Sequence, residues 1–156
     1  MSPAAVTALP ELVLDTNVVL DWIFFRDPRT APLAAAISTG QVRWLACAAL
    51  RAELLHVLER GVRRAGAPSP TEVLESWDRW ATMTEPAAAS PEPRLRCTDP
   101  DDQKFIDFAL QTGASALLSG DRAVLKLASR AARHGLQIVT AQIWQARWAT
   151  DRSGFI

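Results

Sequence analysis

The sequence predicts an α/β protein built on a parallel sheet with helices on both of its faces. Short apolar segments alternate along the chain with longer segments in which apolar residues recur at helical spacing. Gly, Pro and capping residues separate these segments, as they do at helix ends and in turns. Strands that alternate with helices are typical of parallel sheets buried on both faces.

The first half of the chain predicts two strands and four helices. An apolar run indicates a strand over 12–15, and Asn17 or Thr16 can cap a helix over 17–25. A second helix is expected between Thr30 and Gly40, with Pro32 in its first turn. The remaining elements are a strand over 42–46, a long helix over 48–66 and a helix over 69–83.

The second half continues the alternation after a proline-rich segment over 85–97, where we expect no helix but allow a short strand. Asp99 can cap a helix over 99–113, with Pro100 in the first turn and Gly113 at the end. The last predicted elements are a strand over 115–119, a helix over 121–135, a strand over 136–140 and a helix over 141–149.

The charge balance and the cysteines limit which binding partners and which cellular compartment we expect. Lys+Arg and Asp+Glu both number 17, so the formal net charge is zero, and a nucleic acid would have to be attracted by a local basic patch or a metal ion. Cys47 and Cys97 form no CxxC pair and no Cys/His cluster, which argues against zinc and fits a reducing cytoplasm. No apolar run reaches the roughly 18 residues of a membrane span, and the N-terminus lacks the pattern of a signal peptide.

Two acids stand where α/β proteins place their sites, at the carboxyl ends of strands. Asp15 ends the first predicted strand, and Asp121 follows the strand over 115–119. For each Asp taken alone, a helix cap is the favoured interpretation. The functional interpretation therefore depends on whether other acids converge on the same edge.

Glu53 lies inside an apolar helix stripe that includes Leu50, Leu54 and Val57. A Glu that faces the core near the start of a helix needs a partner, because burial of an unpaired charge is costly. The alternative is an edge position from which the side chain reaches water.

The segment "DPDDQKF" contains a further inward acid. Asp102 shares a helix face with Phe105, Ile106 and Ala109, whereas Asp101 is more lateral. Asp102 is therefore the candidate, with Asp99 and Asp101 in reserve, although acids in a first turn also simply complement the helix dipole.

Four carboxylates, from Asp15, Glu53, Asp102 and Asp121, are thus expected at one edge of the sheet. Without a cation they would repel one another. An all-oxygen acidic cluster suits Mg²⁺ or Mn²⁺, which can activate water and polarise a phosphodiester. One ion or two could be held.

Four segments, in order and spacing, resemble the PIN-domain ribonucleases, specifically VapC-like toxins of bacterial type II toxin–antitoxin systems. They are "LVLDTNVVLDW", "AELLHVLER", "DPDDQKFIDFAL" and "LLSGDRAVL". The resemblance covers the core from about 11 to 145 and implies a single PIN-like domain over 1–156. It further implies a three-layer α/β/α fold with a central five-stranded parallel sheet. A member of this family would be an endoribonuclease that depends on Mg²⁺ or Mn²⁺. It would form a homodimer and be silenced by an antitoxin.

Carried over by position, the resemblance makes Asp15, Glu53, Asp102 and Asp121 the catalytic and metal-binding acids. Asn17 would position the Asp15 carboxylate, Ser119 would hold a water or phosphate oxygen near Asp121, and Thr16 belongs to the same motif. One departure is the segment "CAAL" before Glu53, where such proteins often carry a Ser or Thr cap.

A basic stripe beside Asp121 is the candidate RNA-binding surface. Arg122, Lys126, Arg130 and Arg133 share one face of the predicted helix over 121–135, and "RGVRR" over 60–64 is a second cluster. Both are also compatible with ordinary solvated helix faces. The first cluster lies next to the proposed site and would guide phosphates to it.

Other functions remain as alternatives. A PIN-fold protein could bind a partner without catalysis, and a structure-specific DNA nuclease of the same superfamily usually carries larger insertions. A haloacid-dehalogenase-like phosphohydrolase would need a second acid two residues after Asp15, where this chain has Asn17. A serine hydrolase would need a GxSxG segment, which the chain lacks.

Overall fold

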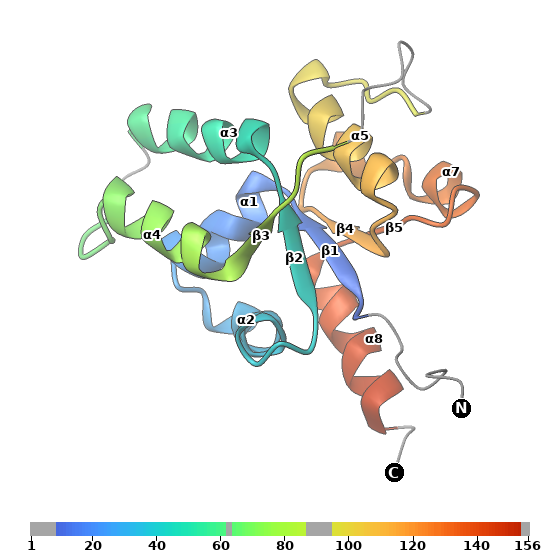
Figure 1. Cartoon of the computed structure of the whole chain (residues 1–156), viewed down its shortest axis with the longest axis horizontal. Helices are drawn as coiled ribbons and strands as arrows, with labels where there is room; N and C mark the ends of the chain where they lie inside the picture. Colours follow the sequence, from blue (N-terminus) through green and yellow to red (C-terminus); the bar gives the residue numbers. More distant parts are fainter. Residues whose placement is uncertain (1–8, 62–63, 87–94, 154–156) are drawn as a thin grey trace.

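The computed structural model describes residues 9–61, 64–86 and 95–153. A parallel sheet of five strands runs through the centre in the order β3-β2-β1-β4-β5 (Figure 1). The strands are β1 Glu11–Leu14, β2 Arg43–Ala46, β3 Ala81–Met83, β4 Ala116–Leu118 and β5 Gln137–Val139. The predicted α/β class and the five-stranded parallel sheet are confirmed.

The central strand β1 lies between β2 and β4 and forms the middle of the core. Leu12 is paired with Trp44 of β2 and with Ala116 of β4. Leu12, Val13 and Leu14 are all buried, although their side chains alternate between the two faces of the sheet. Both faces are therefore covered, as expected for parallel strands.

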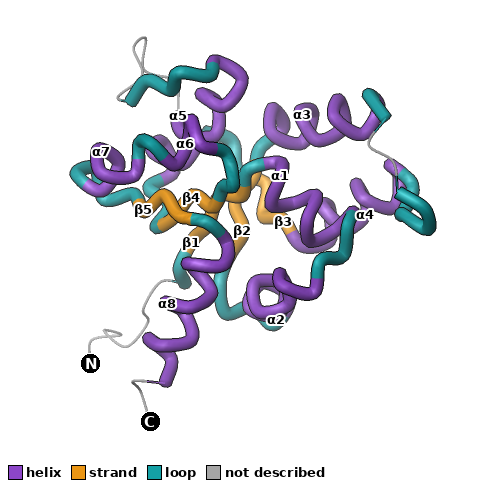
Figure 2. The backbone as a smooth tube through the Cα atoms, turned by 180° about the vertical axis from the view of Figure 1, so that it is seen from behind, coloured by secondary structure: helices purple, strands orange, loops and turns teal. Residues whose placement is uncertain are grey.

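The helices lie around this sheet (Figure 2). α5 contacts β1 and β4, α6 and α7 contact β5, α4 contacts β3, and α2 contacts α8. In Figure 1 the arrowheads of β1 and β2 point toward α1 and α3, whereas α2 lies at the opposite end of the sheet. The α-helices are α1 Thr16–Val19, α2 Ala31–Ser38, α3 Ala48–Glu59, α4 Pro70–Trp80, α5 Gln103–Thr112, α6 Arg122–Leu125, α7 Ala128–Ala132 and α8 Ala141–Ser153. The chain also forms the π-helical turn η1 Leu20–Phe24 and the 3-10 turns η2 Pro28–Thr30 and η3 Pro100–Asp102.

The first helix differs from the prediction in its cap and its form. Asp15, rather than Thr16 or Asn17, is the capping residue, because its Oδ1 atom accepts the Thr16 N–H at 2.7 Å. After four residues the α-helix changes into the π-helical turn η1, in which the Phe25 N–H donates to the Leu20 carbonyl at 2.7 Å. Such turns occur frequently at functional sites.

The expected helix over 69–83 was too long. α4 ends at Trp80, and the next three residues form the edge strand β3, which pairs with β2. The Trp77 Nε1–H donates to the Met83 sulfur at 3.4 Å, which ties the end of this strand to the helix before it. Part of the proline-rich segment, residues 87–94, lies outside the described residues.

Two other helices are shorter than expected. The helix predicted over 48–66 stops at Glu59, and Gly61 follows it with a left-handed φ of 97°. The helix predicted over 121–135 is interrupted at Lys126 and Leu127, so that α6 and α7 are separate. The second basic cluster, over 60–64, includes residues 62–63, which lie outside the described part of the chain.

The segment over 99–113 begins and ends as predicted, but its first turn is not α-helical. The Asp99 carboxylate caps the 3-10 turn η3, and Gly113 ends α5 with a left-handed φ of 69°. This start places Asp99 and Asp102 at the two ends of one tight turn. At the other end of the chain, α8 extends to Ser153, four residues beyond the predicted end.

Candidate metal centre and active site

Asp15 is a buried carboxylate held by two donors at the end of β1. It is only 3% exposed. Its Oδ1 atom accepts the Thr16 N–H and its Oδ2 atom accepts the Ser119 hydroxyl, both at 2.7 Å. Burial raises the pKa of Asp15; the two hydrogen bonds lower it, and the nearby charges of Asp121 and Glu53 raise it further. The carboxylate is thus kept in one orientation beside other acids.

The loop after β4 is joined to the end of β1 by side-chain hydrogen bonds. Ser119 is fully buried, and its Oγ atom accepts the Asp121 N–H at 3.0 Å while donating to Asp15. The Asn17 Oδ1 atom accepts the Gly120 N–H at 3.1 Å. Asn17 therefore holds the loop that carries Asp121. The expected contact of Ser119 with a water or phosphate oxygen stays a prediction.

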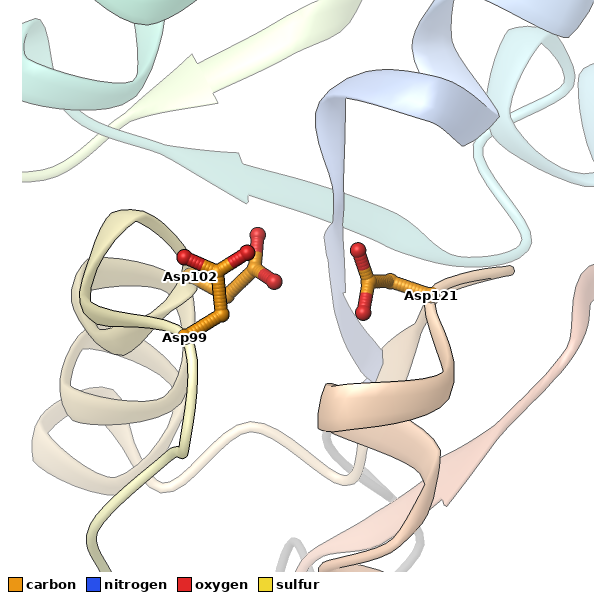
Figure 3. Close-up of side chains that lie close together, drawn as sticks. All are labelled: Asp99, Asp102 and Asp121. Atoms are coloured by element: carbon orange, nitrogen blue, oxygen red, sulfur yellow. The ribbon is translucent and has the colours of Figure 1, made fainter.

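Three carboxylates come together between the start of η3 and the start of α6. Oxygen atoms of Asp99, Asp102 and Asp121 all lie within 4.8 Å of one another. Asp99 and Asp102 face Asp121 across a short gap (Figure 3). The Oδ2 atom of Asp102 is buried and has no hydrogen-bond partner among the described residues. A buried acceptor without a donor is rare and indicates a missing ligand, such as a cation or an ordered water.

The acidic surroundings change the protonation of Asp102. Burial, followed by the charges of Asp15, Asp121 and Asp99, raises the pKa of Asp102 to about 7. Near neutral pH, a proton therefore partly offsets the repulsion among these acids. A divalent cation would stabilise the ionised form and displace that proton.

The other two acids of the trio are anchored through one oxygen each. The Asp99 Oδ1 atom accepts the Asp101 N–H at 3.0 Å, and the Asp121 Oδ1 atom accepts the Ala123 N–H at 2.8 Å. Each keeps its second oxygen for another partner. Anchored carboxylates with one oxygen to spare are suitable ligands for Mg²⁺ or Mn²⁺, so the residues present fit the predicted cation.

Glu53 and Asp101 lie outside this trio. Glu53, on α3, accepts a hydrogen bond from the Lys104 ammonium at 3.0 Å, yet its charge still raises the pKa of Asp15. Asp101 is exposed and contributes its backbone N–H to Asp99. Asp99, a reserve candidate from the sequence, thus joins Asp102 and Asp121. Asp15 lies near enough for its charge to act on Asp102, and Glu53 near enough for its charge to act on Asp15.

Lys104 was not among the residues that the sequence singled out. The expectation that an inward Glu53 needs a partner was the available signal, and Lys104 is that partner. Pattern alone could not find it, because the two residues lie 51 positions apart on different helices.

A model of the family described as PIN domain matches residues 11–123, a range that contains every acid described above. The chain belongs to the PIN-domain family. The family-level resemblance and the three-layer α/β/α fold are therefore confirmed. Among solved structures, this PIN domain is similar to a chain in the crystal structure of VapBC2 from Rickettsia felis bound to a DNA fragment from their promoter. The TM-score is 0.61 at 14% identity, over 82% of this chain and 98% of that chain. No curated protein sequence matches it.

The predicted basic stripe of this PIN domain is divided between two helices. Arg122 begins α6 and Lys126 follows its last residue, whereas Arg130 belongs to α7 and Arg133 follows it. The idea of one continuous helical face over these four residues was wrong, because the helix is interrupted at Leu127. Arg122 remains next to Asp121 and is exposed.

None of the helices in 9–61, 64–86 and 95–153 combines the length and the apolar character needed to cross a bilayer.

Proposed function

We propose that this PIN domain is a divalent-metal-dependent endoribonuclease and the toxin of a toxin–antitoxin pair. One observation carries the proposal: carboxylate oxygens of Asp99, Asp102 and Asp121 all lie within 4.8 Å of one another. One of these acids, Asp102, has a buried oxygen without a hydrogen-bond partner among the described residues. Without a cation, this arrangement costs electrostatic energy. A bound divalent cation would offset this repulsion.

The residues would divide the work as follows. Asp102, Asp121 and Asp99 hold the cation, and Asp15, fixed by Ser119 and Thr16, adds negative charge beside it. When bound, Mg²⁺ or Mn²⁺ supplies positive charge that polarises a phosphodiester and makes water more acidic. Glu53, whose charge acts on Asp15, is the candidate to orient the attacking water.

RNA is the proposed substrate, and hydrolysis would leave a 5′-phosphate and a 3′-hydroxyl. Arg122, with Lys126 and Arg130 farther along, offers cationic side chains beside the acids for the RNA backbone. Neither Cys nor His takes part. Cys47 and Cys97 are buried.

The proposed partners are a second copy of this chain and an antitoxin protein, in the cytoplasm. Support for the antitoxin comes from the structural similarity to a chain of a VapBC2 complex, together with membership in the PIN-domain family. Co-expression with the product of the adjacent reading frame tests the toxin role: induction of this chain alone should arrest growth, and the neighbour should relieve the arrest. Growth that is unaffected by induction would contradict it.

The decisive experiment measures cleavage of a labelled RNA by the purified full chain with Mn²⁺, with Mg²⁺ and with EDTA. We expect metal-dependent products that Asp15→Asn and Asp102→Asn each abolish. Asp151→Asn, on an exposed position of α8, is the matched control and should cleave like wild type.

The same experiment separates the alternatives. Cation binding without cleavage of RNA or DNA would indicate a PIN-fold binding protein, and cleavage restricted to branched DNA would indicate a structure-specific nuclease. The hypothesis of a haloacid-dehalogenase-like phosphohydrolase is no longer supported, because the chain belongs to the PIN-domain family and Asn17 accepts a hydrogen bond from the Gly120 N–H.

A further inference from the structure

An ion pair connects α3 with α5, the helix that begins directly after Asp102 of the acidic trio. The Lys104 ammonium on α5 donates to the Glu53 Oε2 atom on α3 at 3.0 Å. Of the ion pairs within the described residues, it alone includes an acid of the predicted catalytic set. It is also only partly solvated, with side-chain exposures of 37% for Lys104 and 24% for Glu53.

The pair accounts for the position of Glu53 outside the trio. Glu53 lies close enough to Asp15 for the two charges to interact, so it reaches the edge of the site. An oxygen that accepts a hydrogen bond from an ammonium uses the same lone pairs that a divalent cation would use. One Glu53 oxygen is already occupied in this way. A cation and Lys104 therefore have a common target.

Lys104 is placed to act on the site because of its position on α5. It lies two residues after Asp102, so one short segment supplies both a carboxylate of the trio and the ammonium that binds Glu53. Movement of the start of α5 would shift both groups together. The distance between α3 and α5 therefore determines whether Lys104 can hold Glu53, and so whether Glu53 is available to a cation.

We propose that Lys104 is a positioning residue that competes with a bound divalent cation for the Glu53 carboxylate, and so controls how many acids ligate the cation. The proposal rests on the cation-binding site of the proposed function. With the pair intact, Glu53 stays outside the trio, where it can orient water. When the pair opens, Glu53 is free to join Asp99, Asp102 and Asp121 as a ligand.

A double-mutant cycle on Mn²⁺ affinity, without RNA, tests this competition. Calorimetry at pH 8 would compare wild type, Lys104→Met, Glu53→Gln and the double variant, after circular dichroism has verified that each is folded. Lys104→Gln is a second variant without the charge, and Lys104→Arg is the control that retains it. Loss of a nearby positive charge alone would raise the affinity equally with and without Glu53, so only the coupling between the two changes is informative.

We expect the Lys104→Met substitution to raise Mn²⁺ affinity at least about fivefold more in the presence of Glu53 than in the Glu53→Gln background. Lys104→Arg should behave like wild type. Equal effects in both backgrounds would overturn the proposal for Lys104 and leave the cation site intact. A wild-type chain that binds no Mn²⁺ would overturn the proposed function itself, and this inference with it.

Discussion

The Ser119 hydroxyl donates a hydrogen bond of 2.7 Å to the Oδ2 atom of Asp15, which lies 104 positions earlier in the chain. Both side chains are buried, and the same hydroxyl accepts the Asp121 N–H. One serine thus fixes a carboxylate after β1 and the backbone of a second acid after β4. Two neighbouring parallel strands end at the same edge of the sheet, and Ser119 connects the acids that follow them.

Ser119→Ala should therefore weaken both stability and catalysis. The Asp15 Oδ2 atom would stay buried without its donor, which costs about 1–3 kcal/mol of unfolding free energy. Mn²⁺-dependent activity should fall about 10–100-fold, as for other residues that orient metal ligands. Urea denaturation and RNA cleavage measure the two effects. Ser38→Ala, at an exposed position of α2, should change neither; a Ser119→Ala variant equal to wild type would contradict this role.

The raised pKa of Asp102 predicts how the stability of the metal-free protein depends on pH. The pKa is about 7 in the folded protein and 3.8 for an unperturbed Asp. Between these values the folded state binds more protons than the unfolded state, so stability falls as the pH rises through 7. We expect the Tm without metal to be lower at pH 8 than at pH 5, and added Mn²⁺ to raise the Tm more at pH 8.

Asp102→Asn is the variant that tests the origin of this pH dependence. The amide cannot ionise, so the decrease in Tm between pH 5 and pH 8 should be smaller than in wild type. At pH 8 the variant should be more stable than the metal-free wild type by about 0.5–2 kcal/mol, since removal of a crowded charge relieves repulsion at a functional site. An unchanged pH profile would assign the effect to other groups.

Gln103 is expected to hold the segment that leads to Asp99. Its Oε1 atom accepts the Cys97 N–H at 2.7 Å, and its Nε2 atom donates to the Leu95 carbonyl at 2.6 Å. Gln103→Ala should cost about 1–3 kcal/mol, because it leaves these backbone groups without partners. Hydrogen exchange at the Cys97 amide should become faster. Gln111→Ala, on the same helix, is the control, and equal exchange in both variants would refute the role.

Arg122 is expected to contact the RNA backbone. The test measures the binding constant K of a single-stranded RNA at several salt concentrations, without divalent ions. In Arg122→Ala, the slope of log K against log[salt] should be smaller in magnitude than in wild type by about 0.7, which corresponds to one lost phosphate contact. Arg147→Ala on α8 should keep the wild-type slope. If both variants match wild type, the phosphates bind elsewhere.

The predicted elements were wrong where the secondary structure of a segment depends on residues far away in the sequence. Residues 81–83 continue the helical spacing of α4, and only hydrogen bonds to β2 make them a strand. By contrast, Asp99 and Gly113 were assigned correctly, because a capping carboxylate and a left-handed glycine act on adjacent backbone.

Sequence alone was sufficient to locate the α/β alternation and the acids that follow the strands. Hydrophobic periodicity, caps and glycine conformations are local properties, and they can be recognised without knowledge of the rest of the chain. The packing of α3, η3 and α6 around the carboxyl edge determined which acids meet. It brought Asp121 to Asp99 and Asp102, and it paired Glu53 with Lys104. Distances between side chains on separate elements depend on how those elements pack, and no local pattern specifies them.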